Sequence, residues 1–377
     1  GAIYEKDDTA KVLEAINDPE KFVVVHTAPS IRVTLGECFG MHIGTNVQGK
    51  MVAALRRLGF DKVFDTDFGA DLTIVEEANE FLGRVQNGGV LPMITSCSPG
   101  WIKYCEHYYP DMLDHLSSCK SPQQMSGAII KTWYAEKMGI DPKDIVVVGI
   151  MPCTAKKFET KRENQSASGY PDVDYSLTTR ELGRMIDSAG IFFKHLPDEE
   201  FDNPLGDSTG AAVIFGATGG VMEAALRTAV ERLSGEELKS LDFTEVRGTE
   251  GIKEASYTVN GMEIKVCVVS GLANANTIME KVKNGTADYH FIEIMGCPGG
   301  CVNGGGQPIQ HAVVRNFVDL RARRAAALYE ADKDMPLRKS HESEAVKRLY
   351  AEFLGEPGSH KAHEVLHTSY VARPKYK

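Results

Sequence analysis

The chain has 377 residues, 42% hydrophobic and 25% charged, which is ordinary for a globular protein with room for two or three lobes. Its formal net charge of −10 argues against binding to a nucleic-acid backbone or an anionic membrane surface. No stretch approaches the length of a membrane-spanning helix, and the first residues do not have the pattern of a signal peptide.

Short β-rich runs alternate with helical stretches, a pattern that predicts an α/β fold. In the first part of the chain, strands are expected at 22–29, 62–68, 90–97 and 144–153, and helices at 46–59 and 74–87. The strands at 22–29, 90–97 and 144–153 are almost continuously apolar, as strands covered on both faces of a sheet require.

A second set of strands is expected at 211–218, 263–271 and 289–297, with a helix at 220–233. The polar segment 158–175 separates the two sets. The pattern therefore predicts two lobes, 1–170 and 171–331, each a small, mostly parallel sheet flanked by helices, with the active site in the cleft between them. The charged remainder, 332–377, is expected to form a helical tail that wraps the surface.

Eight cysteines without an export signal favour a reducing compartment, the cytoplasm, where clustered thiols bind metal or catalyse more often than they form disulfides. Cys97, Cys153 and Cys297 each follow an expected strand, at the end where open α/β sheets form their binding crevices. Cys301 follows Cys297 closely enough for both to ligate one metal centre. Scattered soft thiolates favour a buried cofactor such as an iron–sulfur cluster over a structural zinc site, which would use local pairs of cysteines.

The sequence GCPGGCVNGGGQP, residues 296–308, indicates a loop whose missing side chains let the backbone approach a large ligand closely. Its N–H groups can donate to sulfide or other anionic ligands. The remaining cysteines are expected to be small buried apolar side chains: Cys38, Cys105, Cys119 and Cys267.

Three segments together resemble the signature sequences of the [FeFe]-hydrogenase catalytic domain: TSCSPGW (95–101), MPCTAKKFE (151–159) and EIMGCPGGCVNGGGQP (293–308). Other segments across nearly the whole chain resemble the same family, among them VIFGATGGVMEAALR (213–227) and RKSHE (338–342). The resemblance implies an H-cluster, a [4Fe–4S] cubane joined through a cysteine sulfur to a diiron subsite with CO, cyanide and azadithiolate ligands.

The resemblance assigns cofactor roles residue by residue. Cys153, Cys297 and Cys301 match cubane ligands, and Cys301 also matches the bridge to the diiron subsite. Lys156 matches a donor to a cyanide ligand, and an ammonium group in a dry pocket makes a strong hydrogen bond to such an anion. The other matches lie beside the diiron subsite or just behind it: Met151, Met295, Pro29, Ser30, Gln123 and Phe215.

The same resemblance implies a proton relay of Cys97, Glu77, Ser117, Glu80 and Arg84. Glu77, Glu80 and Arg84 are spaced i, i+3, i+7 and therefore share one face of their expected helix. Titratable groups within hydrogen-bond reach of one another suit stepwise proton transfer. Without the resemblance, this face would be interpreted as a solvated stripe of salt bridges.

One position departs from the family pattern. The family has two consecutive cysteines where this chain has Cys97 and Ser98, and by position the missing thiol is a cubane ligand. Three alternatives stay open. Ser98 ligates iron through its oxygen, which is slightly favoured; Cys97 moves into the ligand role; or the cubane has three thiolates with water or another group on its fourth iron. Cys119 is a less favoured replacement because it lies well along the chain.

The sequence predicts an iron hydrogenase that catalyses 2H⁺ + 2e⁻ ⇌ H₂. Electrons would be exchanged with ferredoxin or with N-terminal iron–sulfur domains absent from this chain, and maturation enzymes would supply the diiron subsite. One rival is a hydrogen-sensing regulatory hydrogenase, which the intact relay disfavours. A second is an iron–sulfur assembly protein of the same superfamily, which Lys156, Met151 and Met295 disfavour.

Three histidines lie near one face of the last helical segment: His360, His363 and His367. They could bind a metal, but a solvated helix surface is the preferred interpretation.

Overall fold

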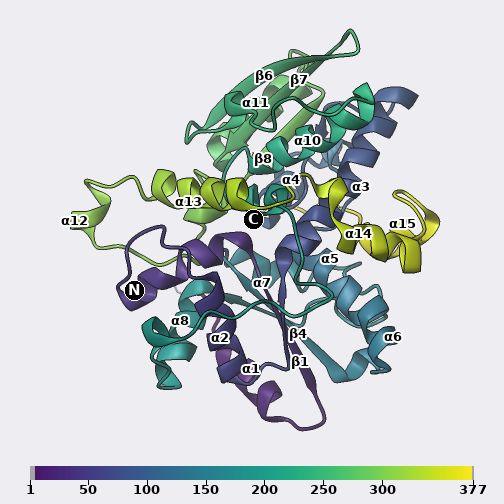
Figure 1. Ribbon diagram of the computed structural model, residues 1–377. Helices are drawn as coiled ribbons and strands as arrows, with labels where there is room; N and C mark the ends of the chain where they lie inside the picture. The colour runs from purple at the N-terminus through teal and green to yellow at the C-terminus, as the bar shows by residue number, and fades with distance from the viewer. Residues whose placement is uncertain (1–4, 376–377) are drawn as a thin grey trace.

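The computed structural model describes residues 5–375, and its core consists of two four-stranded sheets (Figure 1). The first sheet is entirely parallel, in the order β2 (Lys62–Asp65), β1 (Phe22–Thr27), β4 (Ile145–Met151), β5 (Tyr175–Thr178). The second has the order β3 (Met93–Ile94), β8 (Phe291–Met295), β7 (Met262–Ser270), β6 (Ile252–Val259), and only β6 runs antiparallel to its neighbour. The predicted fold class is confirmed.

Helices cover both faces of the first sheet (Figure 1). One face packs against α1 (Thr9–Asn17), α2 (Gln48–Leu58) and α8 (Thr179–Ser188). The other face packs against α3 (Thr66–Asn87), α5 (Pro122–Ile129), α6 (Ala135–Met138), α14 (Glu344–Leu349) and α15 (His360–Leu366). Because both faces are buried, the central strands β1 and β4 can be apolar along almost their whole length.

The second sheet is also covered on both faces. β8 alternates its side chains, so that Phe291 and Met295 pack with α10 (Gly220–Ser234), whereas Ile292 and Ile294 pack with α4 (Pro99–Tyr108) and α11 (Leu272–Lys283). The long helix α3 belongs to both lobes, since Phe68 contacts the core of the first and Phe81 the core of the second.

The sheets do not follow the expected boundary at residue 170. β3 precedes that boundary but pairs with β8 of the second sheet, from Met93 opposite Phe291, and β5 follows the boundary but pairs with β4 of the first. An alternation of strands and helices reveals the fold class but not which strands become neighbours. The chain therefore crosses between the lobes more than once.

Two expected strands are wrong in part. Residues 211–218 form the short helix α9 (Gly210–Val213) and a following 3-10 turn, because an apolar run buried on all sides has no periodicity that separates helix from strand. The expected strand 62–68 ends at Asp65, whose side chain accepts a hydrogen bond from the Asp67 N–H (3.1 Å) and so caps α3.

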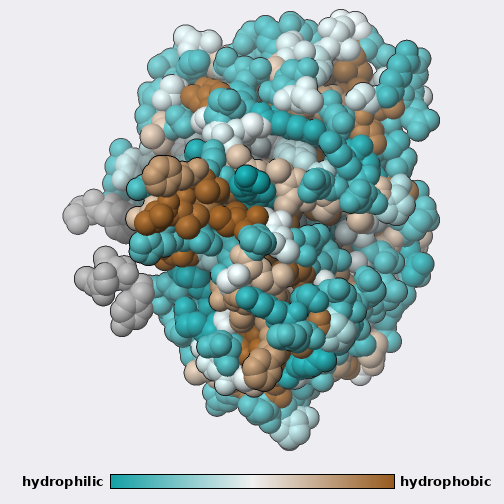
Figure 2. Space-filling model, turned by 60° about the vertical axis from the view of Figure 1, so that its left-hand side comes forward, coloured by the Kyte–Doolittle hydropathy of each residue, from teal (hydrophilic) through white to brown (hydrophobic). Residues whose placement is uncertain are grey.

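The C-terminal part of the chain runs across both lobes. α13 (Leu320–Asp334) lies between them in Figure 1, and α14 and α15 then pack beside α3 and α5. The short helix α12 (Ala312–Arg315) projects to one side, and exposed Ile309, Val313 and Phe317 lie on this segment. Figure 2 shows apolar side chains gathered in a patch on the face that is turned forward there. Among residues 5–375, no helix has the length and hydropathy needed to cross a membrane.

A buried ion network fastens α13 to the second lobe. Arg227 on α10 donates to both carboxylate oxygens of Asp332 (2.9 and 2.8 Å) and to Glu223 (2.8 Å), and all three side chains are fully buried. Arg247 also pairs with Glu223, and Arg338 also pairs with Asp332, so loss of Arg227 leaves each buried carboxylate with one arginine instead of two. Removing a cation from a buried carboxylate is more costly than never forming the pair.

We expect Arg227→Met to lower the free energy of unfolding by about 3 kcal/mol, because two buried carboxylates each lose a cationic partner. Denaturant unfolding followed by circular dichroism measures this change. The matched control is Arg323→Met, at an exposed position of α13, for which the change should stay within about 0.5 kcal/mol. Equal effects of the two substitutions would contradict the assigned role of the network.

Candidate active site

A single cavity lies where strands from both sheets end. It is bordered by the segments that follow β1, β3, β4 and β8 at their carboxyl ends, and by residues of α3, α5 and the short helix α7 (Ala155–Glu159). It contains about 730 Å³ of space not filled by protein atoms, including its opening to solvent. This is the position at which open α/β sheets form binding crevices.

The cavity brings together every residue that the sequence assigned to cofactor or metal binding, and also Cys97. These residues are Pro29, Ser30, Cys97, Ser98, Gln123, Met151, Cys153, Lys156, Phe215, Met295, Cys297 and Cys301. Cys119, the less favoured replacement ligand, does not line this cavity. The lining also includes residues that sequence reasoning did not select, such as Thr66 and Ala70 at the start of α3.

Three thiols from different parts of the chain share one end of the cavity. Burial, together with the neighbouring Cys153 and Cys297, raises the pKa of Cys301 to about 12. Burial and Cys153 raise the pKa of Cys297 to about 11. Thiolates crowded in this way require a cation to balance their charge, and soft thiolates suit iron–sulfur clusters. The donor set and the space beside it therefore fit an iron–sulfur cofactor.

Lys156 is held at the cavity wall by a carboxylate that the sequence analysis did not select. Its ammonium group donates to both Glu159 oxygens (2.9 and 3.0 Å) and to the carbonyl oxygen of Cys97 (3.1 Å). Glu159 also accepts from the Ser121 hydroxyl (2.8 Å) and the Gln123 amide (2.7 Å). The i, i+3 spacing of Lys156 and Glu159 within MPCTAKKFE was the available signal. The other amide atom, Gln123 Oε1, is buried without a hydrogen bond and lies against Gly149 of β4.

Gln307 is a second positioning residue that the sequence analysis did not select. Its amide nitrogen donates to the Ser30 hydroxyl (3.2 Å) and to the Cys301 carbonyl oxygen (3.1 Å). Its amide oxygen accepts from the hydroxyls of Thr34 (2.7 Å) and Thr179 (2.8 Å). The side chain is buried and ties the loop of the third motif to the segment that follows β1.

The glycines of the third motif bring backbone against backbone. Gly300 has a positive φ of 90°, and a Cβ there would lie 2.6 Å from the Thr218 nitrogen. A Cβ on Gly304 would lie 2.3 Å from the Pro152 carbonyl oxygen. The loop therefore needs glycine to pack against its protein neighbours, in addition to any ligand that it approaches.

Ser98 lies on the cavity wall beside the third motif. It precedes α4, and its hydroxyl oxygen accepts a hydrogen bond from the Gly296 N–H (3.0 Å), next to Cys297. The oxygen is thus already oriented toward the loop that carries two of the thiols.

The five residues expected to relay protons are neighbours, from Cys97 at the cavity to Arg84 on α3, and hydrogen bonds join Ser117 to Glu80 and Glu80 to Arg84. Cys97 lies close enough to Glu77 for the carboxylate charge to raise its thiol pKa, after burial as the main cause. Glu77 is hydrogen-bonded to Ser117, and the Ser117 hydroxyl donates to Glu80 Oε2 (3.1 Å). Arg84 donates to Glu80 Oε1 (2.6 Å) and to the Leu116 carbonyl oxygen (2.8 Å). The spacing on α3 predicted that Glu77, Glu80 and Arg84 share one face of the helix. In the structure, Cys97 and Ser117 lie beside this face.

One carboxyl of this series holds its proton at neutral pH. Burial raises the pKa of Glu77 to about 8, and the charge of Glu80 adds to this shift. A carboxyl with such a pKa can both accept and release a proton near neutrality.

Comparison with known proteins relates most of the chain to hydrogenases. The family described as iron only hydrogenase large subunit, C-terminal domain, matches residues 21–305, and that described as iron hydrogenase small subunit matches 318–373. The chain is 51% identical, over its full length, to NADP-reducing hydrogenase subunit HndD of Solidesulfovibrio fructosivorans. It is 48% identical, over 98% of its length, to iron hydrogenase 1 of Clostridium pasteurianum. The chain spans 64% of the length of each of these two relatives.

A solved structure gives the same relationship. A variant of apo [FeFe]-hydrogenase HydA1 from Chlamydomonas reinhardtii is 43% identical and matches with a TM-score of 0.85. The match covers 98% of this chain and 100% of that one.

Replacing Glu77 tests its buried, protonated state. In the folded chain Glu77 binds a proton up to about pH 8, whereas its ordinary pKa is 4.5, so the folded state holds more protons between these values. The free energy of unfolding therefore decreases as pH rises through this window. Glu77→Gln removes that contribution, and its stability relative to the unmodified chain should increase from about pH 5 to pH 8.

Urea unfolding at several pH values, with both proteins in the same cofactor state, measures this difference. The control is Glu236→Gln, an exposed carboxylate, whose difference from the unmodified chain should not change with pH. A pH-independent difference for Glu77→Gln would show that Glu77 is ionised in the folded chain.

Proposed function

The chain belongs to the iron-only hydrogenase family, and from this premise we propose that it is an [FeFe]-hydrogenase that catalyses 2H⁺ + 2e⁻ ⇌ H₂. The observation that carries the proposal is one cavity lined by Cys153, Cys297, Cys301 and Lys156, with a series of titratable groups leading away from Cys97. An H-cluster, when bound, supplies the redox chemistry that combines protons and electrons.

Different residues would hold the two parts of that cofactor. Cys153, Cys297 and Cys301 would ligate the cubane, with Cys301 as the bridge to the diiron subsite. Lys156 would donate to a cyanide ligand, and Glu159 keeps its ammonium group directed at the cavity wall. The apolar side chains that line the rest of the cavity would exclude water from the diiron subsite: Pro29, Met151, Phe215 and Met295.

Protons would move along the series one hydrogen bond at a time. Glu77, which holds a proton at neutral pH, first protonates the Cys97 thiolate. The Ser117 hydroxyl, which donates to Glu80 in the resting arrangement, then turns and gives its proton to the Glu77 carboxylate, while protonated Glu80 returns a proton to the Ser117 oxygen. Arg84 does not give up its proton in proteins, so in this scheme it positions Glu80 instead of carrying the proton itself.

Electron partners are a further part of the proposal. Electrons would come from ferredoxin or from iron–sulfur domains of the same protein, as the resemblance to [FeFe]-hydrogenases implies. Maturation enzymes would deliver the diiron subsite. The eight cysteines are free thiols, which supports a reducing location such as the cytoplasm.

Two alternatives are less well supported. A hydrogen-sensing role would not need a complete proton series, and here Cys97, Glu77, Ser117 and Glu80 are in sequence. An iron–sulfur assembly role would give no purpose to a buried Lys156 beside the three thiols.

The activity test uses the chain loaded with the diiron cofactor and reduced methyl viologen as electron donor. Cys97→Ala should lower the rate of hydrogen evolution by at least about a hundredfold, because the last proton donor is removed. Cys105→Ala, a buried cysteine in the core of the second lobe, is the matched control and should keep a rate within a few-fold of the unmodified chain. Retained turnover in a cofactor-loaded Cys97→Ala variant would rule out this relay.

Replacing Ser98 tests whether its oxygen ligates the cubane. An alkoxide is a harder ligand than a thiolate and favours oxidised iron, so Ser98→Cys should raise the cubane's reduction potential and alter its electron paramagnetic resonance spectrum. Ser98→Ala is the companion variant. Ligation by Ser98 is supported if the electron paramagnetic resonance spectra of Ser98→Cys and Ser98→Ala both differ from that of the unmodified chain. An unchanged spectrum with retained turnover in both variants would exclude Ser98 as a ligand.

A further inference from the structure

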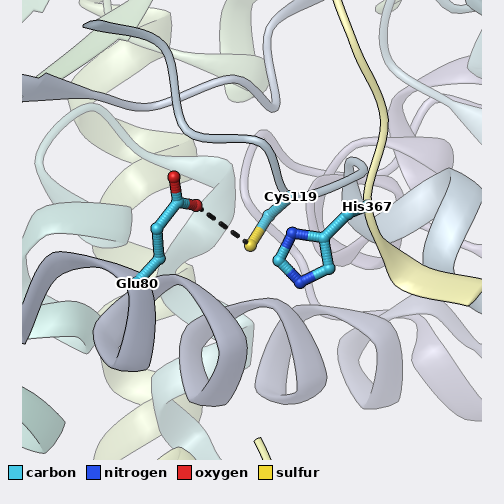
Figure 3. A group of neighbouring side chains, drawn as sticks. All are labelled: Glu80, Cys119 and His367. Atoms are coloured by element: carbon cyan, nitrogen blue, oxygen red, sulfur yellow. Dashed lines mark hydrogen bonds between the residues drawn. The ribbon is translucent and has the colours of Figure 1, made fainter. Parts of the chain in front are cut away.

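A Glu, a Cys and a His meet at the outer part of the proton series, away from the cavity. One potential ligand atom from each of Glu80, Cys119 and His367 lies within 4.8 Å of the others. In Figure 3 the Cys119 sulfur lies between the Glu80 carboxylate and the imidazole ring of His367. We propose that these three residues form a binding site for a soft divalent cation such as Zn²⁺, and that its occupation blocks the proton series at Glu80.

Backbone pairing holds two of the ligands together. Cys119 and His367 face each other in an isolated antiparallel bridge. The Lys120 N–H donates to the Leu366 carbonyl oxygen, and the Thr368 N–H donates to the Ser118 carbonyl oxygen (2.8 Å each). The C-terminal segment is thus fixed to the segment that precedes α5, and the juxtaposition does not depend on flexible side chains alone.

The imidazole ring is oriented as in many metal sites. His367 Nε2 lies 3.2 Å from Glu76 Oε2, and Glu76 is held in turn by the Gly358 N–H (3.0 Å) and the Tyr350 hydroxyl. A carboxylate on one ring nitrogen leaves the other as a ligand and increases its basicity. That nitrogen, Nδ1, faces the Ser118 hydroxyl (2.8 Å), which can rotate away. The expectation that this histidine is simply solvated is therefore wrong.

The charges balance when a cation binds. The Cys119 thiol lies 3.8 Å from Glu80 Oε2, and ligation would replace that contact and release the thiol proton to solvent. One thiolate and one carboxylate then offset the charge of Zn²⁺. Arg84 can stay on the other oxygen, Glu80 Oε1. Three protein ligands leave a fourth position for water or the Ser118 hydroxyl, and small side-chain movements bring the ligand atoms to zinc distances of about 2.0–2.3 Å.

The three residues lie just below the surface. The side chains of His367 and Glu80 are 7% and 15% exposed, while Cys119 is buried behind them. The ring of the exposed His363 lies against the ring of His367, with centroids 4.1 Å apart.

A bound cation would block the proton series because one of its ligands, Glu80, belongs to that series. Glu80 accepts the hydrogen bond of Ser117 through the same Oε2 atom that faces Cys119. A carboxylate bound to zinc through that atom cannot exchange a proton with Ser117. This consequence rests on the proposed hydrogenase function, whereas cation binding does not.

The binding test uses the iron-loaded chain, zinc chloride in metal-free buffer, and removal of loose metal by gel filtration. We expect about one zinc per chain, unchanged iron content, and a zinc K-edge absorption spectrum with one sulfur ligand at about 2.3 Å among lighter ligands. Cys119→Ala and His367→Gln should each lose the bound zinc, and Cys267→Ala, a buried cysteine of the second lobe, should keep it. Absence of bound zinc, or a spectrum without sulfur, overturns the site.

The inhibition test compares each protein with its own rate in the absence of zinc. The zinc concentration that halves hydrogen evolution should rise at least about tenfold in Cys119→Ala relative to the unmodified chain and to Cys267→Ala. Zinc bound through sulfur without inhibition would overturn the block at Glu80, although it would leave the cation site in place. A chain that binds zinc but evolves no hydrogen even without it would count against the proposed function alone.

Discussion

The convergence of three partly buried thiols that follow strands of two separate sheets is the constraint on which the rest of the structure depends. Cys153 follows β4 of the first sheet, whereas Cys297 and Cys301 follow β8 of the second. A cofactor that binds all three thiols therefore requires the two lobes to keep their relative position. Gln307 links the third motif to the first lobe, and buried Arg324 on α13 adds a second link. Its guanidinium donates to both Glu37 oxygens (2.8 and 2.7 Å) and to the Val302 carbonyl oxygen (2.8 Å).

Three carboxylates of helix α3 make three different sets of contacts. Glu76 orients His367, Glu77 lies beside Cys97 at the cavity, and Glu80 connects Ser117, Arg84 and Cys119. In the proposed mechanism, a single long helix that belongs to both lobes would carry protons to the cavity and would also contact the C-terminal segment that holds the proposed cation site.

The sequence predicted those features that depend on residues close together in the chain. The apolar strands β1, β4 and β8, the cysteines after them and the shared face of Glu77, Glu80 and Arg84 were all readable from the sequence. The pairing of distant strands could not be predicted from the sequence, so β3 was assigned to the wrong lobe. The buried helix α9 was predicted as a strand because its apolar run has no periodicity. Gln307 was missed because only the tertiary structure brings its partners near. Glu159 had a local signal in its i, i+3 spacing from Lys156, but its contact with Gln123 depends on the tertiary structure.

Infrared spectroscopy of the chain loaded with its diiron cofactor tests the central claim most directly, because CO and cyanide vibrations occur where proteins do not absorb. The account predicts both sets of bands, and it predicts that Lys156→Met shifts a cyanide band, since the charge-assisted hydrogen bond to that ligand is lost. Glu236→Gln, at an exposed position far from the cavity lining, should leave the bands unchanged. Absence of CO and cyanide bands from a chain that has bound its cubane iron would contradict the account.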